Sequence, residues 1–164
     1  CTAAIHDAIA AGSGFFQHGH TYMGHPVATA AAGAVLRRLT DDGLVARAAE
    51  VGVTLRAALA DRFGQHPHVG DIRGRGMFLG LELVADRETK APFPPEAALA
   101  RRIKAAAFEA GLICYPMGGT IDGRRGVHVL LAPPFILTDA QVGELVEKLA
   151  IGIDRGIGAV RAAA

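Results

Sequence analysis

The stretch Val69–Val84, "VGDIRGRGMFLGLELV", decides the fold class, because the period of its apolar residues changes and Leu79, Leu81 and Leu83 alternate with Gly80 and Glu82. Alternation with a period of two predicts β-strands, here over 69–73 and 77–84. Residues 74–76, Gly-Arg-Gly, separate the two segments and allow a tight turn or a bulge. The stretch therefore predicts an antiparallel hairpin, or else one bent strand.

Helical patterns surround this stretch. Apolar residues recur every three or four positions over 44–63 and again over 96–110, which predicts two amphipathic helices. The alanine-rich segment 26–39 predicts a further helix with a proline in its first turn, and 4–11 a short one. A last helix is expected after Thr138, because Thr138 and Gln141 form a capping-box pattern.

Two more strands are expected downstream, over 112–115 and from Val127 to the Pro133-Pro134 pair. The intervening "PMGGTIDGRRG", residues 116–126, predicts a loop, since its four glycines and one proline oppose regular structure. The order of elements predicts an α+β fold, with a short, mostly antiparallel sheet and helices packed on one face.

Composition excludes several classes of protein. The 164 residues carry a formal net charge of +1, without a long run of either sign, so nucleic acid and anionic membranes are poor partners. No apolar run approaches the roughly twenty residues that cross a bilayer. The two cysteines offer no disulfide framework and favour a reducing cytoplasmic setting. Because the sequence opens at Cys1 within a helical pattern, we expect a fragment of a longer protein.

The segment 18–26, "HGHTYMGHP", is rich in histidine and invites comparison with a metal site. Imidazole is a common zinc ligand, but zinc sites usually add a cysteine or carboxylate at short spacing, and none stands nearby. A metal site is therefore disfavoured for its three histidines, His18, His20 and His25.

A phosphate-binding turn is a better use of the same segment. Gly19 and Gly24 let the backbone approach an anion, and Thr21 offers a hydroxyl and a backbone N–H. The helix that begins at Pro26 presents its positive end nearby. An ordinary helix start explains the spacing equally well, so the residues alone leave both interpretations open.

Four segments resemble, in order, the C-terminal part of the class III aminotransferases that depend on pyridoxal phosphate (PLP), the ω-transaminase group of fold type I. They are "FFQHGHTYMGHPVATAAAGAVL", "VGDIRGRGMFLGLELV", "GLICYPMGG" and "VLLAPPFILTDAQV". The resemblance covers nearly the whole chain. It implies a remnant of the large domain with the cofactor-phosphate loop over 1–25, connecting helices over 26–64, and the small C-terminal α+β domain over 65–164.

The resemblance also implies roles for residues. In this family a His-Thr or Phe-Thr pair reaches across a homodimer and binds the cofactor phosphate of the partner subunit, a role that falls on Thr21 with His20 beside it. The parent enzyme would transfer an amino group between an amine or amino acid and a keto acid.

The lysine that anchors the cofactor in this family is expected before Cys1, as is the aspartate that pairs with its pyridine nitrogen. The chain's own lysines, Lys90, Lys104 and Lys148, read as solvated. We therefore expect no covalently bound cofactor on this chain and no transamination by it alone.

Substrate recognition is less constrained. Leu130 stands where ornithine- and GABA-type relatives carry an arginine, three residues before Pro133. Arg124 or Arg125, in the preceding glycine-rich loop, could bind a substrate carboxylate instead, as a mobile arginine does in amine:pyruvate-type relatives. Two solvated loop arginines explain the pattern equally well.

Other residues are interpreted as structural. We expect Arg73 to pair with Asp71 or Glu82, and Cys114 to be an inert core thiol. A different class of function also stays open, a non-catalytic α+β binding or assembly module whose interface is the helix Val27–Leu39.

Overall fold

The computed structural model describes residues 1–162 and divides into two compact units, one over Cys1–Asp41 and one that begins at Asp42. The first unit contains helices α1 (Ala3–Ala11) and α2 (Pro26–Asp41), as expected, and neither buries a residue. Its exposed apolar side chains include Phe15, Phe16, Tyr22, Met23, Val27, Val35 and Leu36. Alanine favours helix without packing, so this unit forms helices without a core of its own.

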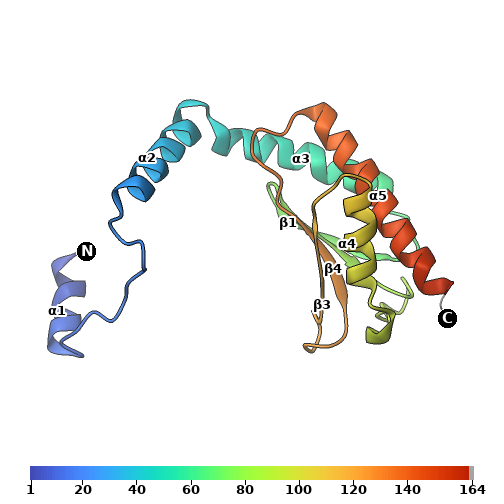
Figure 1. Cartoon of the computed structure of the whole chain (residues 1–164), viewed down its shortest axis with the longest axis horizontal. Helices are drawn as coiled ribbons and strands as arrows, with labels where there is room; N and C mark the ends of the chain where they lie inside the picture. The colour runs from blue at the N-terminus through green and yellow to red at the C-terminus, as the bar shows by residue number, and fades with distance from the viewer. Residues whose placement is uncertain (163–164) are drawn as a thin grey trace. The chain divides into compact units, whose positions relative to one another are not determined.

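The second unit is built on a four-stranded antiparallel sheet (Figure 1). Its strand order is β1-β2-β4-β3, with bounds Val69–Arg75, Phe78–Leu83, Val127–Leu131 and Tyr115–Gly118 respectively. β1 pairs directly with β2, which confirms a hairpin over the quoted stretch and excludes one bent strand.

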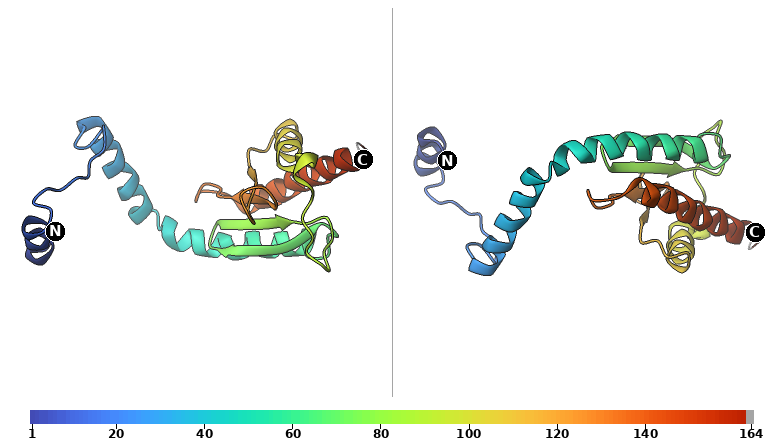
Figure 2. Two further views of the ribbon diagram at one scale, coloured as in Figure 1. Left: turned by 90° about the horizontal axis from the view of Figure 1, so that it is seen from below. Right: turned by 90° about the horizontal axis from the view of Figure 1, so that it is seen from above.

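Three helices cover one face of this sheet: α3 (Leu44–Phe63), α4 (Leu99–Glu109) and α5 (Asp139–Arg161). Alternate residues of the central strands are buried beneath them, namely Leu79, Leu81, Leu83, Val127, Val129 and Leu131. Seen from below, β1 and β2 lie in front of α3 (Figure 2). The predicted α+β class, the antiparallel sheet and the packing of helices on one face are confirmed.

Two predicted boundaries were wrong. The strand expected over 112–115 is β3, Tyr115–Gly118, so it takes in the start of the expected loop. Pro116 is tolerated there because β3 is an edge strand, which forms its ladder on one side only. The helix expected from Glu96 begins at Leu99, after a separate 3₁₀ turn, η1 (Pro95–Ala97), and a left-handed Ala98 with φ of 49°.

Close backbone approach explains glycines inside two helices. A Cβ atom on Gly156 of α5 would lie 2.6 Å from Ile103 Cγ1 of α4 and about 3 Å from its backbone. A Cβ on Gly52 of α3 would lie 2.4 Å from the backbone of Gly76, in the β1–β2 turn. Separations under 3 Å are not found between real Cβ atoms and their neighbours, so these helices pack at a distance that only glycine permits.

The capping box of α5 is present as predicted. The Thr138 hydroxyl accepts the Gln141 N–H at 3.3 Å, and the Gln141 side chain accepts the Thr138 N–H at 3.0 Å. Thr138→Ala is expected to lower the free energy of unfolding by about 1 kcal/mol, measured by denaturant titration, because one helix N–H loses its acceptor. Thr138→Ser keeps that acceptor and should restore stability; equal losses in both variants would contradict a capping role.

Candidate functional site

The segment 18–26 forms a turn ahead of α2. Met23 donates its N–H to the His20 carbonyl at 2.9 Å, and His25 donates to the Tyr22 carbonyl at 3.0 Å. The imidazole Nδ1 of His25 accepts the Ala28 N–H at 3.4 Å, so this histidine helps to cap the helix. His25 thus supports the interpretation of the segment as an ordinary helix start. Thr21 takes no part in capping the helix.

Thr21 is exposed at the start of this turn, and its hydroxyl makes no hydrogen bond with another residue of the described range 1–162. His20 lies beside it and contacts His18 edge-on, with ring centroids 4.9 Å apart. A free hydroxyl and turn amides before a 16-residue helix suit one side of a phosphate group. Within the described part of the chain, no three His, Cys, Asp or Glu side chains are grouped to hold a metal ion.

The two candidate substrate arginines differ in the glycine-rich loop between β3 and β4. Asp122 Oδ1 accepts the backbone N–H groups of Arg125 at 2.7 Å and Arg124 at 3.0 Å, and its Oδ2 accepts Arg125 Nε at 2.7 Å. The backbone N–H of Arg125, followed by its guanidinium, lowers the pKa of Asp122 to about 2. The Arg125 side chain is therefore paired at neutral pH.

Arg124 has no such partner. Its guanidinium forms no hydrogen bond or ion pair with any residue that the structure describes, although the side chain borders a small cavity of about 70 Å³ beside η1. The sequence did not single out Asp122, although an aspartate two or three residues before the amides it accepts is the signal of an Asx turn.

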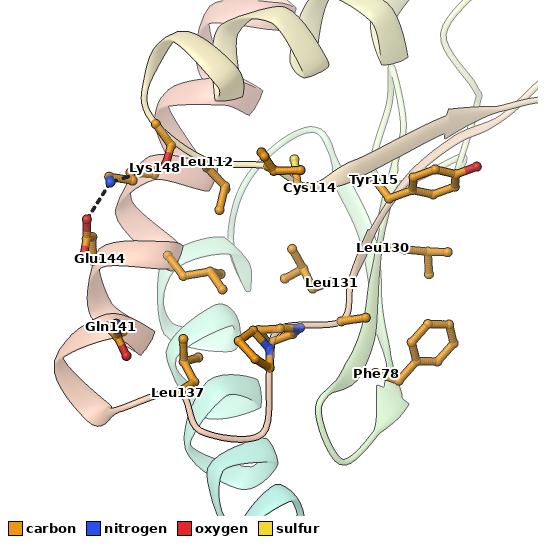
Figure 3. Close-up of a pocket in the computed structure, with 16 residues that line it drawn as sticks. Phe78, Leu112, Cys114, Tyr115, Leu130, Leu131, Leu137, Gln141, Glu144 and Lys148 are labelled. Carbon is orange, nitrogen blue, oxygen red and sulfur yellow. Dashed lines mark hydrogen bonds and ion pairs between the residues drawn. The ribbon is translucent and has the colours of Figure 1, made fainter. Parts of the chain in front are cut away.

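A cavity of about 540 Å³ lies between α5 and the ends of β3 and β4 (Figure 3). Tyr115, Leu130 and Phe78 lie on one side of it, and Lys148, Glu144 and Gln141 of α5 lie on the other. Tyr115 and Leu130 are register partners on adjacent strands.

The residues that line this cavity include Leu130 and Cys114, both of which the sequence drew attention to. Burial raises the pKa of the Cys114 thiol, so the protonated form is favoured, as an inert thiol requires. Leu130 extends an apolar wall beside Tyr115. Neither Arg124 nor Arg125 lines this cavity.

The sheet face away from the helices carries a charged cluster. Arg73 pairs with Asp71 at 2.8 Å and with Glu82 at 2.6 Å, which confirms the predicted pairing. The hydrogen bond from Arg73 lowers the pKa of Asp71 and the bond to Glu82 raises that of Arg73. Desolvation, with a smaller contribution from Arg73, lowers the pKa of His128 on the neighbouring strand.

All three lysines lie at the surface. Lys90 donates to the Gly70 carbonyl at 2.7 Å, Lys148 pairs with Glu144 at 2.5 Å, and Lys104 is exposed on α4. The exposure of Lys90 and Lys104 agrees with their interpretation as solvated side chains, whereas Lys148 is half-buried and paired with Glu144.

Comparison with known proteins decides the family. The sequence model of the class-III aminotransferases matches residues 1–152. The chain belongs to the class-III aminotransferase family. It is 50% identical to an uncharacterized aminotransferase of Schizosaccharomyces pombe over 151 residues, covering 92% of this chain and 32% of that protein. It is 40% identical to an uncharacterized aminotransferase of Bacillus subtilis over 143 residues, covering 87% and 32%.

Solved structures of ω-transaminases share the fold. An (S)-enantioselective ω-transaminase from Thermomicrobium roseum aligns with a TM-score of 0.79 at 33% identity, over 95% of this chain and 33% of that one. An engineered thermostable ω-transaminase from Pseudomonas jessenii aligns with a TM-score of 0.75 at 37% identity, over 95% and 32%. The chain thus spans about a third of the length of the curated relatives it matches. Within the described residues, no helix combines the length and apolarity that crossing a bilayer requires.

Proposed function

We propose that the chain is the C-terminal part of a PLP-dependent aminotransferase that moves an amino group between an amine or amino acid and a keto acid. The match of the class-III family over residues 1–152 is the observation that carries this proposal. In the proposed division, residues 1–25 belong to the large domain, 26–64 connect, and 65–164 form the small domain.

PLP, when bound, supplies the electron sink that lets a bond at the amine-bearing carbon break. The residues of this chain would orient the cofactor and recognise the substrate. Thr21, with His20 beside it, would bind the phosphate of a cofactor held in the partner subunit of a homodimer, since its hydroxyl is exposed and unused within the described residues. Arg124 would bind a substrate carboxylate, since its guanidinium has no partner among them. The two free cysteines fit the proposed cytoplasmic location.

The function is tested with the longer protein that contains this chain. That protein is expected to transfer an amino group from a primary amine to a 2-keto acid, and borohydride should fix PLP to a lysine outside residues 1–164. Chain 1–164, treated alone, should gain no cofactor mass. Failure of the longer protein to transfer would contradict the proposed activity, and an adduct on Lys90, Lys104 or Lys148 would contradict their solvated role.

Thr21→Ala, made in the longer protein, is expected to weaken PLP binding about tenfold, because one hydrogen bond to a charged phosphate is lost. Equilibrium dialysis of the cofactor measures the change. Thr21→Ser keeps the hydroxyl and should stay within about twofold of the parent. Thr40→Ala is the matched control, since the Thr40 hydroxyl bonds the Leu36 carbonyl within α2; an equal loss there would count against a specific role for Thr21.

A non-catalytic assembly module is the second candidate. It is favoured by α2, where Val27, Val35 and Leu36 are all exposed and no residue is buried. The reading frame upstream of Cys1 distinguishes the two candidate functions. A PLP-lysine motif there supports the aminotransferase, and its absence supports the assembly module.

A further inference from the structure

A pair of histidines in the turn between α3 and β1 lies where the C-terminal end of α5 meets the sheet. His68 is only 8% exposed, and both of its ring nitrogens have partners. Nδ1 lies 3.0 Å from the Val84 carbonyl, and Nε2 lies 2.7 Å from Nη2 of Arg161, in the last turn of α5. A carbonyl only accepts and a guanidinium only donates. His68 must therefore be neutral, with its proton on Nδ1.

His66 is fixed in the opposite tautomer. Its Nδ1 accepts the backbone N–H of His68 at 3.1 Å, so that nitrogen carries no proton. Its Nε2 lies 3.0 Å from Asp154 Oδ1 of α5 and donates to that carboxylate. The two imidazoles, with ring centroids 6.0 Å apart, thus join two points of α5 to one turn while both are neutral.

Charged side chains reach the pair from α3, from α5 and from the segment after β2. From α3, Arg62 shares Asp154 at 2.9 Å. Arg87, after β2, donates to the carbonyls of Gly64 and His66. Phe93 packs against His68 at 5.4 Å between ring centroids and keeps water from that side. His68 has no carboxylate partner among the described residues, so its only charged neighbour by direct contact is the Arg161 cation.

We propose that His68 and Arg161 form an acid-sensitive latch that holds the last turns of α5 on the sheet. Protonation of His68 places a second N–H on Nε2, facing a guanidinium that can only donate. The bond then becomes a contact between two donors of like charge. Mild acid therefore releases the end of α5, while the α4–α5 contact around Gly156 stays packed.

The tautomers are the first test, by long-range ¹H–¹⁵N spectra of chain 1–164 at neutral pH. His68 is expected as the Nδ1–H form and His66 as the Nε2–H form. The same tautomer at both positions, or a charged His68, would overturn the latch.

The release is the second test, by hydrogen exchange of the backbone amides at 157–161, corrected for the intrinsic effect of pH. Their protection is expected to fall about tenfold between about pH 7.5 and about pH 5, because a protonated Nε2 of His68 no longer accepts a hydrogen bond from Arg161. Arg161→Gln should abolish most of this fall, because it removes the guanidinium that protonated His68 would face. Arg155→Gln removes an exposed arginine from the same helix and should keep the full response.

Two results would overturn the proposal. The first is unchanged protection of 157–161 across this pH range in the parent chain. The second is an equal loss in the parent and in Arg161→Gln, since the response would then not depend on the guanidinium.

Discussion

Gly156→Val is expected to lower the free energy of unfolding of the second unit by about 3 kcal/mol, the upper range for overpacking a close-packed contact. A Cβ at this position would stand 2.6 Å from Ile103 Cγ1 and 3.1 Å from the Ile103 backbone N. The side-chain atom can rotate away, but the backbone of α4 cannot, so the two helices must separate. Separation would uncover Ile103 and Ile153, both fully buried.

The matched control lies two residues further along the same helix. A Cβ on Gly158 meets nothing within 4 Å, so Gly158→Val introduces the same side chain without a clash. It should change stability by no more than about 0.5 kcal/mol, as surface substitutions do. Urea denaturation followed by circular dichroism compares the two variants, and similar midpoints would show that the α4–α5 spacing adapts to a larger residue.

Local signals explain the parts of the fold that the sequence predicted well. The β1–β2 hairpin depends on alternation and on glycines at 74 and 76, and the α5 start depends on Thr138 and Gln141. All of these lie within a few residues of one another. The boundaries of β3 could not be predicted in the same way, because Pro116 is compatible with a strand only at a sheet edge. Strand order, which makes β3 an edge, is a tertiary property.

The contacts described above differ in the same way: those between residues close in sequence were predictable, and those between distant residues were not. The Arg73 pair was predictable because residues 71 and 73 alternate onto one face of a strand. The histidine turn was not, since His66 and His68 meet residues that are 88 and 93 positions away in sequence. The helical pattern of α5 alone gave no sign that Asp154 and Arg161 have these partners.

The loop between β3 and β4 shows how structure separates residues that the sequence left equivalent. Arg124 and Arg125 are adjacent, both exposed, and both suited to a carboxylate. Asp122 binds the side chain of Arg125 and only the backbone of Arg124. Because the pKa of Asp122 is lowered to about 2, its carboxylate keeps that charge, and the pairing with Arg125, down to about that pH. Of these two arginines, Arg124 is thus the one whose guanidinium has no partner among the described residues.

Arg124→Ala, made in the longer protein, is therefore expected to lower kcat/KM for a carboxylate-bearing keto acid by about 10- to 100-fold, the value of a charged hydrogen-bonded pair. A substrate without a carboxylate should change by less than about threefold, since it makes no such pair. Arg125→Ala is the matched control and should change both substrates by less than about threefold, because an exposed ion pair contributes little. Steady-state kinetics with the two substrate types measures the split. Equal losses for both types in Arg124→Ala, or a larger loss in Arg125→Ala, would mean that the carboxylate is bound elsewhere or by the arginine that Asp122 holds.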